Sequence, residues 1–88
     1  MCCVLVKVFS DNYGGPYIEY VELFPSFEKA KKLMESDSKS DYKSAIIDWE
    51  KNKKEGKNKP YFDFDKDYEN LLVLVNCGKT TVWSIYEF

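Results

Sequence analysis

The segment from Tyr61 to Glu69 alternates aromatic and acidic side chains, and this pattern restricts its conformation more than that of any other stretch. In a strand, successive side chains point to opposite faces with a period of two. An extended segment therefore turns Phe62, Phe64 and Tyr68 to one face, with Lys66 as the only interruption. The carboxylates on the other face form what we name the acidic ridge: Asp63, Asp65, Asp67 and Glu69.

Four further stretches have the composition of strands. Residues 2–9 are β-branched and apolar except at Lys7, which predicts a central strand that is covered on both faces. Residues 10–16 hold a dense cluster of turn formers, including Gly14 and Gly15, and should close a hairpin into a strand over 17–24. Residues 71–77 and 80–88 predict a second pair of strands around a turn at Gly78 and Lys79.

A helix is predicted over residues 26–36. Ser26 suits the N-cap and Glu28 suits the positive end of the helix dipole in the first turn. The apolar side chains then recur on one face of the helix, at Phe27, Ala30, Leu33 and Met34. Residues 36–40 are small and polar, and we interpret them as a connector.

Residues 42–50 fit two patterns. Tyr42, Ala45, Ile46 and Trp49 have helical spacing, in a helix that would end at Gly56. The same segment alternates at Ala45, Ile47 and Trp49 as a strand would. We favour the strand, because one helix already suffices to cover one face of a small sheet.

These elements predict an α+β fold in a single small domain over 1–88. The sheet should have four to five mostly antiparallel strands, with one helix, or two, packed on one face. We expect the helix to contact a set of mostly β-branched strand residues: Val4, Val6, Val8, Val73, Val75 and Trp83.

The chain has no histidine and no arginine, and its net charge is -2. It therefore lacks the usual near-neutral general base and the bidentate fork that reads phosphate or guanine, so we expect no enzyme. Asp63, Asp65 and Asp67 match the first three ligands of a calcium loop, but Tyr68 and Leu74 stand where that loop needs Gly and Glu. We predict no metal and no cofactor.

The three cysteines have no zinc-site spacing, and reduced thiols are expected. The first residues lack the features of a signal peptide, and no apolar run is long enough to span a membrane. The sequence thus predicts a cytoplasmic protein with no membrane partner.

Two charged segments are candidate binding surfaces. The acidic ridge, with Tyr61 and Tyr68, presents a negative strip that would fit a basic groove built for a nucleic-acid backbone. It would equally neutralise the neighbouring lysine loop, a name we give to Lys51, Lys53, Lys54, Lys57 and Lys59. The alternative is a nucleic-acid-binding module, in which the lysine loop contacts phosphates and Tyr61 and Tyr86 stack on bases.

The Asp-Asn-Tyr-Gly-Gly turn of residues 11–15, followed by Phe24-Pro-Ser-Phe-Glu-Lys-Ala30, resembles small proteins encoded by bacteriophages and mobile elements of AT-rich bacteria. The resemblance covers roughly residues 4–50. It implies a stoichiometric inhibitor of host nucleases or immune systems, a group that includes anti-CRISPR proteins, and it assigns no functional residues. The partner would be a bacterial protein, and a homodimer is also compatible with an exposed sheet edge.

Overall fold

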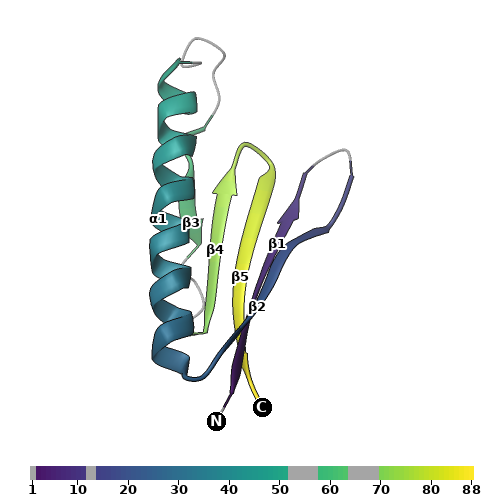
Figure 1. The fold of residues 1–88 in the computed structure, drawn as a ribbon. Coiled ribbons are helices and arrows are strands. Elements are labelled where there is room, and N and C mark those ends of the chain that lie inside the picture. Colours follow the sequence, from purple (N-terminus) through teal and green to yellow (C-terminus); the bar gives the residue numbers. More distant parts are fainter. Residues whose placement is uncertain (1, 12–13, 52–57, 64–69) are drawn as a thin grey trace.

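The computed structural model places one helix against a five-stranded antiparallel sheet, which confirms the α+β class (Figure 1). It describes residues 2–11, 14–51, 58–63 and 70–88. The elements follow one another as β1 (Cys3–Ser10), β2 (Tyr17–Phe24), α1 (Phe27–Lys51), β3 (Tyr61–Asp63), β4 (Leu71–Asn76) and β5 (Lys79–Glu87).

The strands are arranged in the order β2-β1-β5-β4-β3, so β5 is central and β1 is paired on both sides. The predicted hairpin joins β1 to β2, where the Asp11 side chain accepts a hydrogen bond from the Gly14 amide at 2.7 Å. The turn between β4 and β5 is centred on Cys77 and Gly78, whose φ angles are 52° and 81°. It thus lies one residue earlier than predicted, and Lys79 already belongs to β5.

Helix α1 begins as predicted, with the Ser26 hydroxyl accepting a hydrogen bond from the Lys29 amide at 3.3 Å. It continues for 25 residues, so the predicted connector over 36–40 and the favoured strand over 42–50 are both wrong. The buried stripe runs through both segments, at Ala30, Met34, Ser38 and Ala45. Because these positions are four or seven residues apart, they form one helical face, and packing of that face overrides the weak helix propensity of the serines.

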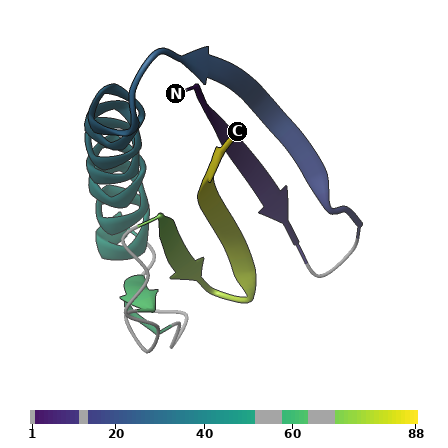
Figure 2. The same ribbon diagram turned by 90° about the horizontal axis from the view of Figure 1, so that it is seen from below.

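The helix covers one face of the sheet, as Figure 2 shows along the helix axis. The core between the two layers consists of Cys3, Leu5, Ala30, Met34, Leu74, Trp83 and Ile85. Of the strand residues expected there, only Trp83 is present. The β1 valines alternate with Cys3, Leu5 and Lys7 and therefore point away from the helix.

The second face of the sheet, which we name the open face, is covered by no segment within the described ranges. Strand register places aliphatic side chains of three strands on it, with β5 between β1 and β4. They are Ile18, Val21 and Leu23 on β2, Val4, Val6 and Val8 on β1, and Leu71, Val73 and Val75 on β4. The expectation that the first strand is covered on both faces is therefore wrong for the part of the chain described.

Candidate functional site

A buried lysine lies at the centre of the interface between helix and sheet. Lys7 projects from β1 toward α1 and is only 6% exposed. Its ammonium nitrogen is 2.8 Å from a carboxylate oxygen of Asp41 and 3.1 Å from oxygens of both Asp37 and Glu19. We name these four residues the Lys7 cluster. Two carboxylates come from successive turns of α1 and the third comes from β2, so the cluster joins three elements.

A β-bulge in β2 brings Glu19 to this position. Lys7 is opposite Tyr20 and Val8 is opposite Ile18, so Glu19 is the extra residue of the bulged strand. The Glu19 carboxylate pairs with the Lys7 ammonium, and the Tyr20 ring centroid lies 5.7 Å from the same nitrogen. Adjacent residues of one strand thus both reach Lys7, which regular alternation would not allow.

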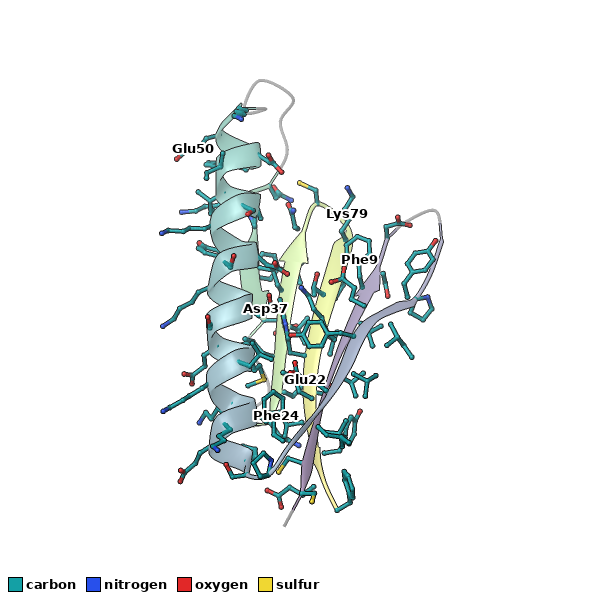
Figure 3. All side chains as sticks on the ribbon, in the orientation of Figure 1. Phe9, Glu22, Phe24, Asp37, Glu50 and Lys79 are labelled. Atoms are coloured by element: carbon teal, nitrogen blue, oxygen red, sulfur yellow. The ribbon has the colours of Figure 1, made fainter. Side chains whose placement is uncertain are left out.

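Asp37 is the acceptor that organises the aromatic side of the cluster. Its Oδ2 atom accepts a hydrogen bond from the Tyr20 hydroxyl at 2.7 Å and one from the Trp83 indole N–H at 3.0 Å. The same oxygen is the one paired with Lys7. Figure 3 shows Asp37 pointing from α1 toward the sheet. Three donors from β1, β2 and β5 therefore converge on one carboxylate of the helix.

The electrostatics hold Lys7, Asp37 and Tyr20 in their ordinary charge states. Burial lowers the pKa of Lys7, but hydrogen bonds to Asp41, Glu19 and Asp37 outweigh burial and raise it. Burial likewise raises the pKa of Asp37, whereas the donors Trp83, Tyr20 and Lys7 outweigh it and lower that pKa. Burial and the hydrogen bond to Asp37 both raise the pKa of Tyr20. All three pKa values are shifted farther from pH 7, whereas a general acid or base needs a pKa near the working pH.

Two hollows lie on the side of the sheet that α1 covers. A cavity of about 210 Å³ adjoins the Lys7 cluster and is lined by Phe9, Glu19, Asp41, Ala45, Leu74 and Lys79, among others. A wider groove of about 550 Å³ lies near Phe27 and Tyr86. The first is smaller than the roughly 300–1,000 Å³ typical of ligand sites, and the second lies within that range.

The three cysteines are free, and the described residues contain no group of three or more histidine, cysteine, aspartate or glutamate side chains that is placed to hold a metal ion. In the Lys7 cluster, the space between the carboxylates is occupied by the lysine ammonium itself.

The open face carries several of the most exposed apolar side chains among the described residues. Ile18 and Leu23 are each 68% exposed and Val21 is 57% exposed. Tyr86 on β5 and Tyr61 on β3 add two aromatic rings, each more than half exposed. Large exposed apolar patches mark interaction sites, whereas single exposed apolar residues do not.

The structure describes only the start of the acidic ridge. Phe62 points toward the helix and stacks on Tyr42, with ring centroids 5.1 Å apart, and the flanking Tyr61 and Asp63 have the opposite orientation. The predicted alternation is therefore confirmed over β3. The other predicted binding residues of this segment, Asp65, Asp67, Tyr68 and Glu69, lie outside the described residues.

The lysine loop is described only at its two ends. Lys51 is the last residue of α1 and Lys59 precedes β3, and both are exposed. Lys53, Lys54 and Lys57 lie outside the described ranges. The proposed stacking residues Tyr61 and Tyr86 share the open face but come from β3 and β5, with β4 between them.

The Lys7 cluster is not predicted from the sequence. The available signal was one lysine within an apolar strand, together with Asp37 and Asp41 at helical i, i+4 spacing. That spacing was hidden, because residues 36–40 were assigned to a connector. The bulge that adds Glu19 has no clear signature in the sequence.

Comparison with protein-family models, with curated proteins and with solved structures finds no match for this chain. Within the described ranges, no helix is both long enough and apolar enough to cross a membrane. Function is therefore inferred from the geometry and chemistry of the Lys7 cluster, the open face and the acidic ridge.

Proposed function

We propose that this chain is a non-enzymatic binding protein that docks against another polypeptide through the open face of its sheet. The observation that carries the proposal is the largely apolar surface that β2, β1 and β4 form opposite the helix, with Thr80, Val82 and Ser84 of β5 between β1 and β4. Antiparallel sheets with one solvated face usually alternate apolar and polar side chains. Here the side chains that point away from the helix are predominantly aliphatic as well, which favours a face that a partner covers.

The chemistry of the buried polar groups supports a role without catalysis. Lys7 is fully engaged by three carboxylates, and Asp37 accepts from three donors. Within the described residues, no buried side-chain nitrogen or oxygen lacks a hydrogen-bond partner. A reactive group generally needs a pKa near the working pH and access to substrate. The Lys7 cluster instead has the properties of a structural ion-pair network that links α1 to the sheet.

The experiment is affinity capture from a bacterial lysate that carries CRISPR and restriction systems, with the tagged chain and its Val21→Lys variant. Lysine at this exposed position of the open face should reduce capture of the bound protein at least tenfold. Ile47→Lys is the matched control, because Ile47 is 52% exposed on α1, away from the sheet. Equal capture by the wild type and the Val21→Lys variant, with self-association also unchanged between them, would contradict the proposal.

A second candidate surface is the acidic ridge, and the orientation of Asp63 favours it. Because Phe62 is held against Tyr42, Asp63 is directed away from the core, as a recognition carboxylate would be. We propose that a ridge continuing through Asp65, Asp67 and Glu69 occupies a basic groove of a bacterial nucleic-acid-handling or immune protein, as the resemblance to phage-encoded inhibitors implies.

The ridge and the open face can be tested separately. Replacing the four ridge carboxylates by lysine should abolish inhibition or binding through the ridge and leave the fold intact. Unchanged affinity after this replacement would remove the ridge from the mechanism. Val21→Lys leaves the ridge sequence unaltered. Because Asp63 lies at the margin of the open face, a second ridge variant that keeps Asp63 and replaces Asp65, Asp67 and Glu69 by lysine distinguishes the two surfaces.

A further inference from the structure

We infer that the polypeptide covering the open face is a second copy of this chain, so that two sheets pack face to face in a homodimer. The inference rests on the proposed function, because it assumes that the open face is a docking surface. It goes further by naming the occupant. Three properties of the face carry it: its extent, the absence of charge from its described centre and the size of its central side chains.

The exposed apolar side chains extend across the whole sheet. Large apolar side chains that are more than half exposed on this face are Ile18, Val21 and Leu23 on β2, Tyr86 on β5 and Tyr61 on β3. Half-buried valines of β1, β4 and β5 lie between them. A standard-size interface takes roughly 800 Å² from each partner, more than the roughly 300–600 Å² of the largest apolar patch on a typical monomer. An apolar surface that reaches from one edge of the sheet to the other has the extent that such an interface needs.

The charge distribution suits contact between identical surfaces. A twofold dimer brings the same patch of each copy together, so every charge in the patch lies near its own counterpart or needs an opposite charge within the same patch. Register places no lysine and no glutamate on the described part of the open face. Among the described residues of the face, the one carboxylate is Asp63, at the margin on the edge strand β3. Self-association therefore brings no like charges together at the centre.

The centre of the face allows close approach. The central strand β5 contributes Thr80, Val82 and Ser84 to this face, all of them small. Larger side chains occur toward the margins, on β2 and at Tyr86. Two such surfaces can approach to the spacing of about 10 Å at which sheets stack in β-sandwiches. The two sheets would then form the core of the dimer, with the helices on the outside.

The experiment is sedimentation velocity of the purified full chain over concentrations from about 1 to 200 µM, with circular dichroism as the check on folding. The wild type should sediment at twice the chain mass of 10.4 kDa. Val21→Lys should weaken the dimer at least a hundredfold, whereas the matched Ile47→Lys variant should dimerise as the wild type does. Val21 is 57% exposed, so lysine there should not prevent folding.

A second variant separates face packing from pairing of the exposed β2 edge. Val82 lies on central β5, two strands from that edge, so Val82→Lys should abolish a face-packed dimer and leave an edge-paired dimer unchanged. A dimer that survives both lysine variants uses another surface and overturns the inference. A wild type that stays monomeric to 200 µM also overturns it. In that case the proposed function stands if Val21→Lys still loses a captured protein, and fails if capture is unaltered.

Discussion

Trp83 donates its indole N–H to the carboxylate of Asp37 at 3.0 Å, which ties the central strand to the middle of the helix across 46 residues of sequence. The same oxygen accepts the hydroxyl of Tyr20 and lies 3.1 Å from the ammonium of Lys7. A single carboxylate thereby fixes where α1 lies along β1, β2 and β5. The interface is specified by this polar network as well as by the apolar core around it.

Tyr20→Phe tests how much one hydrogen-bond donor to Asp37 contributes to the stability of the fold. Removing the hydroxyl deletes the 2.7 Å hydrogen bond to Asp37 and leaves the ring in place. Because the acceptor is charged and partly buried, we expect the free energy of unfolding to fall by about 1–2 kcal/mol. Chemical denaturation measures it. Tyr17→Phe, at an exposed position of the same strand, is the control and should change stability by less than about 0.5 kcal/mol. Equal effects would argue against the network.

Asp37→Asn should alter the dependence of stability on acid pH. The pKa of Asp37 is lowered in the folded state, so its carboxylate stabilises the fold above the unfolded-state value of about 3.9. That contribution is lost as pH falls through the lowered folded-state pKa. The stability difference between wild type and variant should therefore be largest near pH 6 and shrink toward pH 2–3. Denaturation curves across this range measure it, with Glu22→Gln as the control. A stability difference between wild type and variant that does not change with pH would contradict a lowered pKa of Asp37 in the folded state.

Lys7→Met tests the cation at the centre of the cluster. It keeps the length of the side chain but leaves Asp37, Asp41 and Glu19 without their shared positive charge. Because these carboxylates retain some contact with water, we expect a loss of about 2–4 kcal/mol at pH 7. Chemical denaturation measures the loss, and Lys43→Met on the exposed surface of α1 is the control.

The same variant has a predicted signature at alkaline pH. The pKa of Lys7 is raised in the folded state, so the stabilisation is complete below the unfolded-state value of about 10.4 and is lost as pH rises toward the folded-state pKa. The gap between wild type and Lys7→Met should therefore narrow above about pH 10.5. A gap that stays constant to pH 11.5 would show that Lys7 acts through packing alone.

Local elements are predicted well from the sequence, whereas the packing contacts between those elements are predicted poorly. The hairpin, the N-cap at Ser26 and the two C-terminal strands follow from turn formers, capping chemistry and β-branched runs, which act over a few residues. The second half of α1 was mispredicted because residues 36–40 have weak helix propensity on their own. Their helical state depends on Asp37 and Ser38, which face the sheet, and therefore on contacts distant in sequence.

The two candidate surfaces differ in the same way. The alternation of Phe62 and Asp63 follows directly from the period of a strand. The open face cannot be predicted in this way, because the apolar residues of β1 occur on both faces of that strand and the sequence does not say that α1 covers only one face of the sheet. The Lys7 cluster needs strand order, helix length and a bulge to be known together, and none of these can be read from one segment.

The stacked pair Tyr42 and Phe62 provides a test of how β3 is held. The rings lie 5.1 Å apart at an interplanar angle of 27° and join the second half of α1 to a strand of only three residues. A double-mutant cycle with Tyr42→Ala and Phe62→Ala should give a coupling energy of about 0.5–1.5 kcal/mol. Tyr42→Ala combined with Val8→Ala, which lies on the open face, should give additive effects. A coupling near zero for the stacked pair would mean that other contacts anchor β3, and that the orientation of Asp63 does not depend on the stack.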